Sequence, residues 1–208
     1  MALAARVEGD LRIAGNLTVD GTVPTMARSN LIQNPAAKFA IPLTEFRVWD
    51  ALATNLPATS ATDDLGLYGG TFASASPTIA TGDVKNTTVT RYARFQCVIP
   101  VEYDAAETLT LRFSAGMQTT VASASATIDV QAYKSDREVG IGADICATAA
   151  QSINSLTFGN KDFTITPSGL TAGDVLDVRI TIYVEDSATA TAVIGTIGAV
   201  DLLVDIKG

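Results

Sequence analysis

Few residues in this chain have a type and spacing that could support chemistry. The 208 residues include no histidine, so the side chain that most often relays protons and binds metals near neutral pH is missing. A Ser-His-Asp triad is excluded for the same reason. The segment GIGADI, with Gly140 and Gly142, is like the start of a dinucleotide loop. It lacks a third glycine and a βαβ setting, which favours an ordinary loop or hairpin.

Two acidic pairs could in principle serve as metal ligands or as an acid and a base. Asp63 and Asp64 could supply oxygens to calcium, but no further acidic residue follows at short spacing, which favours a solvated turn. Glu185 and Asp186 would face opposite ways on a strand. We therefore predict no catalytic residue, no metal, no cofactor and no enzyme activity. An enzyme would need carboxylates such as Asp63, Asp64 and Asp144 to meet in the fold.

The two cysteines, Cys97 and Cys146, are too few for a disulfide framework and too far apart for a redox CxxC pair. A cysteine nucleophile would also lack its usual imidazole base. Cys97 alternates in phase with Phe95 and Ile99, which marks it as a core residue. We expect structural roles for both thiols.

The composition indicates a sheet protein that binds neither nucleic acid nor membrane. Apolar residues make up 47% of the chain but aromatic residues only 6%, so the apolar content is mostly small and β-branched. A formal charge of -8, without a block of like charges, argues against a phosphate-binding groove. The start MALAARVEGD and the absence of an 18-residue apolar run predict no signal peptide and no membrane span.

Residues 85–208 show strand periodicity. Apolar and polar residues alternate in YARFQCVIPVEY, LTLRFSAGM, ATIDVQAY, VLDVRITIYVE and AVDLLVDIKG. In VLDVRITIYVE the face opposite the apolar one carries Asp177, Arg179, Thr181 and Tyr183. Pro100 favours an edge strand or a bulge. We predict an all-β fold, an antiparallel β-sandwich of about seven or eight strands with jelly-roll or Greek-key connections.

Residues 25–84 read as an irregular connector. Prolines at positions 35, 42, 57 and 77 interrupt any long element. A short helix is expected at 44–54, where Thr44 could cap the start and Phe46 and Trp49 could share a face.

Residues 1–24 form a predicted β arm with glycine hexads. In GDLRIAGNLTVDGTV, glycines recur every six residues, at Gly9, Gly15 and Gly21. Stacked hexad coils need more neighbours than one chain supplies. A lone coil would leave the apolar side chains Val7, Leu11, Ile13, Leu17, Val19 and Val23 in water. Copies of the chain in a three-chain bundle would cover them. A meander with a hairpin turn at Asp20-Gly21 is the alternative.

A resemblance adds to this interpretation. GNLTVDGTV resembles short N-terminal segments of virion structural proteins of tailed bacteriophages, and residues 46–70 and 147–208 are similar to other phage-encoded chains. Head decoration, or cement, proteins among them are often trimers of β-sandwiches with an N-terminal arm. The resemblance implies a non-enzymatic homotrimer that stabilises the capsid surface of a virion and is made in the host cytoplasm. Its partners would be its own copies and the major capsid protein, contacted through the apolar arm residues together with Phe46 and Trp49.

The alternative function is the head of a tail spike or fibre that binds a host receptor or glycan. Sugar-binding sandwiches stack sugar rings on exposed aromatic side chains. The pattern places Tyr133 and Tyr183 outward, and Trp49 lies in the connector.

Deletion of residues 1–24 tests the capsid hypothesis. We expect the truncated protein to keep a folded sandwich but to lose attachment to capsids, because the arm supplies the contacts. Sedimentation of capsids with the two proteins measures attachment. Saturation of capsids by the truncated protein would show that the arm is not the attachment device.

Overall fold

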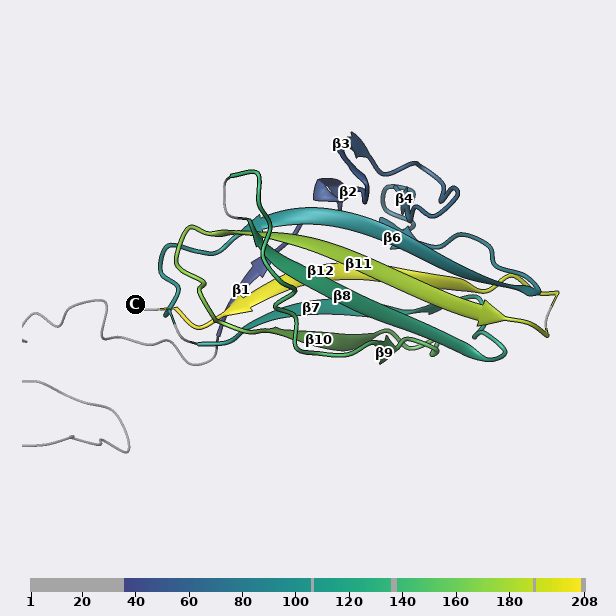
Figure 1. Cartoon of the computed structure of the whole chain (residues 1–208). Coiled ribbons are helices and arrows are strands. Elements are labelled where there is room, and N and C mark those ends of the chain that lie inside the picture. Colours follow the sequence, from purple (N-terminus) through teal and green to yellow (C-terminus); the bar gives the residue numbers. More distant parts are fainter. Residues whose placement is uncertain (1–35, 106, 136–137, 189, 207–208) are drawn as a thin grey trace, which may run out of the picture.

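The structure is a computed structural model that describes residues 36–105, 107–135, 138–188 and 190–206. These residues form two antiparallel sheets of six strands each that pack face to face (Figure 1). The predicted antiparallel β-sandwich is confirmed. No helix within these ranges is long and apolar enough to cross a membrane. The glycine-hexad arm at 1–24 lies outside the described residues.

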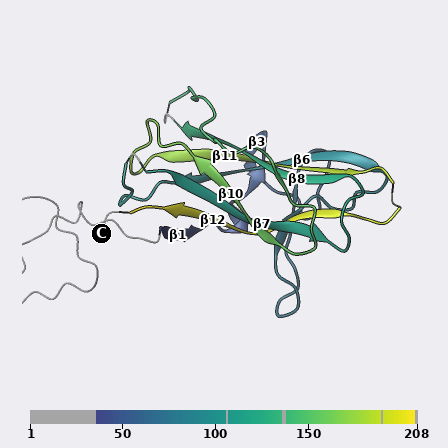
Figure 2. The same cartoon turned by 90° about the horizontal axis from the view of Figure 1, so that it is seen from below.

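The chain alternates between the two sheets from β5 (Thr78–Ala80) to β8 (Ser125–Ser135). The first sheet has the order β10 (Gly159–Ile165), β7 (Leu109–Gln118), β12 (Ile194–Val204), β5 (Thr78–Ala80) and β4 (Gly66–Tyr68), and β1 (Ala37–Ala40) also pairs with β12. Figure 2 shows β1 beside β12. The second sheet has the order β3 (Ala51–Asn55), β2 (Arg47–Val48), β6 (Thr87–Val98), β11 (Val175–Asp186), β8 (Ser125–Ser135) and β9 (Gln151–Ser152).

The core lies between the sheets and follows the period of two. The predicted inward side chains of β11 are all buried: Leu176, Val178, Ile180, Ile182 and Val184. From the first sheet, Phe113 and Phe163 meet edge to face with ring centroids 5.7 Å apart, an arrangement favoured by the ring quadrupoles. In β11, alternation in the sequence therefore identifies the core-facing side chains correctly.

The helix expected at 44–54 is wrong. The structure has a one-turn 3-10 helix at Leu43–Glu45, followed by the hairpin of β2 and β3, which turns at Trp49 and Asp50. Arg47 of β2 pairs with Arg94 of β6. Helix nucleation is unfavourable for so short a segment. The edge of β6 instead provides backbone hydrogen-bond partners for β2.

The boundary expected near residue 85 is also wrong. The described part of the predicted connector contributes β1 to β5, which join both sheets. Phe46 and Ile79 from this segment are buried in the same core as the later strands. Pro42, Pro57 and Pro77 lie between short strands rather than inside them, so they do not interrupt any ladder of hydrogen bonds. The sandwich begins at β1.

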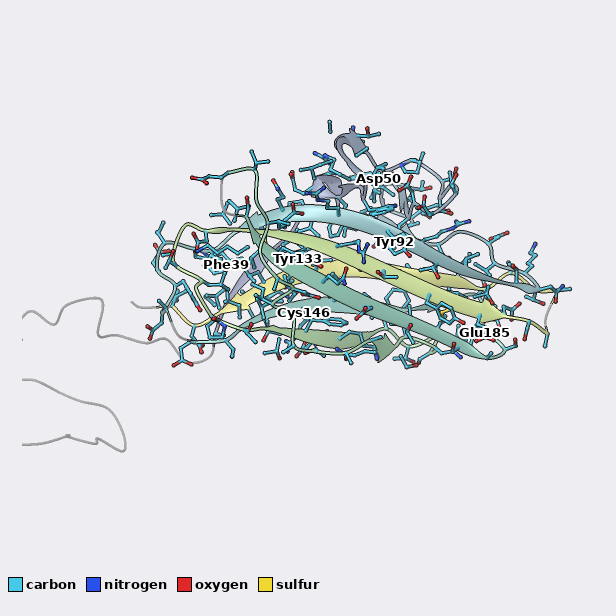
Figure 3. All side chains as sticks on the ribbon, viewed as in Figure 1. Phe39, Asp50, Tyr92, Tyr133, Cys146 and Glu185 are labelled. Atoms are coloured by element: carbon cyan, nitrogen blue, oxygen red, sulfur yellow. The ribbon has the colours of Figure 1, made fainter. Side chains whose placement is uncertain are left out.

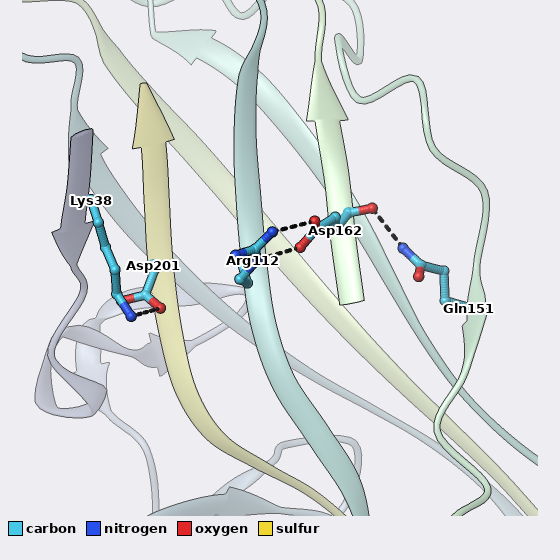
Figure 4. A network of polar contacts seen from close by, with 5 residues as sticks. All are labelled: Lys38, Arg112, Gln151, Asp162 and Asp201. Atoms are coloured by element: carbon cyan, nitrogen blue, oxygen red, sulfur yellow. Dashed lines mark hydrogen bonds and ion pairs between the residues drawn. The ribbon is translucent and has the colours of Figure 1, made fainter. Parts of the chain in front are cut away.

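A row of charges crosses the outer face of the first sheet (Figure 4). Lys38 pairs with Asp201 at 2.9 Å, and the Arg112 guanidinium donates two hydrogen bonds of 2.7 Å to Asp162. This fork lowers the pKa of Asp162. Gln151 donates to the backbone oxygen of Asp162 at 2.7 Å. The ionic groups of this row are paired with one another.

The substitution Phe46→Ala tests whether residues before β6 belong to the core. Phe46 is 1% exposed and packs on Phe95 with ring centroids 4.6 Å apart. We expect a loss of about 3–5 kcal/mol in the free energy of unfolding, measured by chemical denaturation. Phe72→Ala is the matched control, since Phe72 is fully exposed, and it should change stability by less than about 0.5 kcal/mol. Equal effects of the two substitutions would contradict a shared core.

Candidate functional site

The outer face of the second sheet carries a shallow hollow of about 240 Å³ over β6, β11 and β8. We call it the outer-face hollow. Arg179 of β11 lies at its centre, because it pairs in register with Arg94 on one side and Gln131 on the other. The lining residues are Trp49, Arg94, Gln131, Tyr133, Ile141, Asp177 and Arg179. Most of these residues lie on long paired strands, so the backbone fixes the direction in which their side chains leave the sheet.

An aromatic cluster forms one side of the outer-face hollow. The rings of Trp49 and Tyr92 lie 5.1 Å apart between centroids. The Arg179 guanidinium carbon is 5.6 Å from the Trp49 ring and 5.2 Å from the Tyr92 ring, within the range of a cation–π attraction. Tyr133 of β8 lines the hollow as well. Figure 3 labels Tyr92 and Tyr133 on this sheet.

Trp49 is held in place by a neighbouring loop. Its indole Nε1 donates to Asp63 Oδ2 at 3.1 Å, and the backbone oxygen of Asp63 accepts from the Tyr92 amide at 2.7 Å. Asp63 therefore orients the tryptophan. In the same loop, burial raises the pKa of Asp64, and the charges of Asp63 and Asp50 raise it further.

A charged pair forms another part of the lining. Arg94 Nε donates to Asp177 Oδ1 at 2.6 Å, and Nη2 donates to the other oxygen. Gln96 adds a 3.3 Å bond to the same carboxylate. The hydrogen bond to Asp177 raises the pKa of Arg94. Asp177 is only 7% exposed, so it is a fixed and largely desolvated acceptor at the floor of the hollow.

Arg179 is bound differently from Arg94. Its Nη2 donates to the neutral amide oxygen of Gln131, and its Nε is buried with no hydrogen-bond partner. No carboxylate within the described ranges forms an ion pair with Arg179. The hollow thus combines aromatic faces, an amide, a fixed carboxylate and a guanidinium without an ionic partner. This set can stack against a ring and exchange hydrogen bonds with polar substituents.

The predicted contact residues fall in three places. Trp49 lies in the outer-face hollow. Phe46 lies in the core and offers no surface for a partner. The arm residues Val7, Leu11, Ile13, Leu17, Val19 and Val23 lie outside the described residues. Of the predicted outward tyrosines, Tyr133 lines the hollow, whereas Tyr183 lies outside it and bonds to Glu185.

Sequence reasoning missed Tyr92, Arg94, Gln131, Asp177 and Arg179 as site residues. Their outward positions were visible in the alternation of four of them, all except Tyr92. The neighbourhood of β6, β11 and β8 was not, because alternation within a strand carries no information on which strands pair.

Two of the acidic residues singled out in the sequence accept hydrogen bonds from backbone amides. Asp186 is buried and accepts hydrogen bonds from the backbone amides of Ser123 and Asn86, at 3.1 and 3.4 Å. Asp144 accepts from the amides of Ala132 and Cys146. No group of three metal-ligating side chains occurs in the part of the chain that the structure describes.

Comparison with known proteins gives structural likeness only. No family model matches the chain, and no curated protein does. Among solved structures, a xylan-binding module, CBM15, is similar at 12% identity with a TM-score of 0.42, over 83% of this chain and 99% of that one. TmCBM61 in complex with beta-1,4-galactotriose is similar at 10% identity and a TM-score of 0.34, over 82% and 89%.

A further likeness is to a mutant Xylanase10C from Cellvibrio japonicus in complex with xylopentaose. It has 13% identity and a TM-score of 0.35, over 69% of this chain and 28% of that one. At these scores the likenesses carry no argument about what this chain binds.

The two thiols should differ in reactivity. Burial raises the pKa of Cys97 to about 12, from 9.0, so at pH 8 its thiolate fraction is lower by roughly a thousandfold. Burial also raises the pKa of Cys146, but less. We expect iodoacetamide at pH 8 to alkylate Cys146 first, as measured by peptide mass spectrometry. Faster alkylation of Cys97 than of Cys146 in the folded protein would contradict this expectation.

The raised pKa of Cys97 also makes stability depend on pH. Because the folded pKa is raised, the contribution of Cys97 to stability is complete below about pH 9 and falls between pH 9 and 12.

Proposed function

We propose that the chain is a saccharide-binding module whose site is the outer-face hollow. The observation that carries the proposal is that aromatic side chains, hydrogen-bond donors and hydrogen-bond acceptors lie together on one face of the sheet. Trp49 and Tyr133 supply ring faces, and Asp177 and Gln131 supply acceptors beside the Arg179 donor. Sugars present apolar C–H faces and hydroxyls that donate and accept, and this lining suits both.

The site is built to bind with little rearrangement. Asp177 is held by Arg94 and Gln96, and Trp49 is held by Asp63. Ordering these side chains before the ligand arrives lowers the entropy cost of binding. The hollow is shallow, so it supports a ring lying against the sheet, with the rest of the glycan extending into solvent.

This proposal takes up the alternative of the sequence analysis, a head that binds glycan. It is supported by the described residues alone. The capsid decoration hypothesis depends on the arm at 1–24, and it stays a prediction. The two are compatible, since an arm can attach a module that presents a binding face elsewhere.

Glycan binding is testable with an array of neutral and acidic oligosaccharides. Trp49 is the sole tryptophan of the chain, so a saccharide that stacks in the hollow should change the tryptophan emission. Isothermal titration of the best array ligand then gives the affinity. Tyr133→Ala should weaken binding by at least about fivefold, because it removes one stacking face.

Tyr183→Ala is the matched control for this experiment. Tyr183 is also an outward tyrosine of the second sheet, but it lies outside the hollow, so its removal should leave the affinity unchanged. The proposal fails if no saccharide binds, or if Tyr183→Ala and Tyr133→Ala weaken binding equally.

A further inference from the structure

A second pocket is lined by Arg91 of β6 and shares no lining residue with the outer-face hollow. We call it the Arg91 pocket. Its volume is about 450 Å³, within the range of small-molecule sites. The segment around Ser60, strands β4 and β5, the interior of β6 and the ends of β7 and β12 contribute to the pocket. Its lining includes Ser60, Tyr68, Thr78, Gly82, Arg91 and Gln118. Arg91 and Tyr92 are consecutive in β6, so they point to opposite faces of the sheet.

The charge of Arg91 stands on the core side of the sheet. Arg91 is in phase with Ala93 and Phe95, which are fully buried. Its Nη1 donates to the hydroxyl of Ser60 and to the backbone oxygen of Thr81, and its Nε is buried without a partner. These acceptors are neutral. A half-buried charge without an ionic partner is costly unless an anion offsets it.

The acidic side chains nearby do not offset it. Asp83 also lines the pocket, but its carboxylate pairs with Lys85 at 3.8 Å and is 63% exposed. No ion pair to Arg91 occurs among the described residues. The pocket therefore presents a guanidinium without an ionic partner among the described residues, in a chain whose formal charge is -8.

The surroundings of Arg91 are rich in hydroxyl groups. The Ser60 hydroxyl lies 3.4 Å from the Tyr68 hydroxyl. Gly82 has a φ of +68°, and a Cβ there would stand 2.3 Å from the Ser60 hydroxyl and 2.9 Å from that of Tyr68. A glycine is thus required for these groups to gather beside the arginine.

We propose that the Arg91 pocket binds a small polyhydroxylated carboxylic acid, a sugar acid or hydroxy acid. The guanidinium matches the carboxylate, and the hydroxyl of Tyr68 and the amide of Gln118 match ligand hydroxyls. The Ser60 hydroxyl donates to the backbone oxygen of Thr81 at 2.5 Å and so holds the wall of the pocket. This inference is independent of saccharide binding in the outer-face hollow.

The test compares two ligands that differ in one group, glucuronate and the neutral glucuronamide, by NMR titration of the full chain. We expect glucuronate to bind about tenfold tighter or better, because it adds a charge-assisted hydrogen bond. Amide shifts should map to Ser60, Tyr68 and Gly82 and not to Gln131 or Tyr133. Equal affinities, or shifts mapped to the outer-face hollow, would overturn the proposal without requiring any variant.

Two arginine variants sharpen the result. Arg91→Gln should abolish the preference for glucuronate. Arg112→Gln, which removes a partly exposed arginine of the first sheet outside both pockets, should keep it. A preference that survives in Arg91→Gln would show that the arginine only ties Ser60 to Thr81. Saccharide binding in the outer-face hollow can fail while this experiment succeeds, and the reverse also holds.

Discussion

The pairing of β11 with β6 on one side and β8 on the other is the constraint on which the rest of the structure depends. Its registers run without a shift along most of all three strands. Every second side chain of the three strands therefore enters the core, and the side chains between them form one solvent face. A slip of one residue in either pairing would turn one of the paired strands over, so that its apolar side chains would face solvent and its polar side chains would face the core. The hydrophobic effect that selects the core thus also selects the composition of the outer-face hollow.

The sequence predicted the faces of the strands but not their neighbours. The inward positions of β7, β8, β11 and β12 follow from alternation, since burial rewards a period of two whatever the topology. The meeting of Gln131, Arg179 and Arg94 depends on the order of strands far apart in the sequence, and no local pattern encodes that order. The site was therefore visible only as separate outward residues.

The errors before residue 85 have one physical origin. Strands as short as β2 and β4 show too few periods to be recognised, and their stability comes from the sheet that they join rather than from their own residues. In the sequence, the three-residue spacing of Phe46 and Trp49 is compatible with one face of a helix. In the fold they separate, one into the core and the other into the solvent-facing aromatic cluster. Tertiary contacts overrode the local preference.

Trp49 enters the outer-face hollow from an unusual direction. It belongs to the turn of the β2–β3 hairpin, which touches β6 through one register pair, whereas the other aromatic and charged groups of the hollow stand on long central strands. The short β2–β3 hairpin at the edge of the sheet thus forms one wall of the hollow, and the central strands form its floor. Substitutions and length changes in the hairpin turn can reshape that wall while the central strands keep their packing. In the proposed saccharide site, the contribution of Trp49 can therefore change with the hairpin turn while the central strands that form the core stay the same.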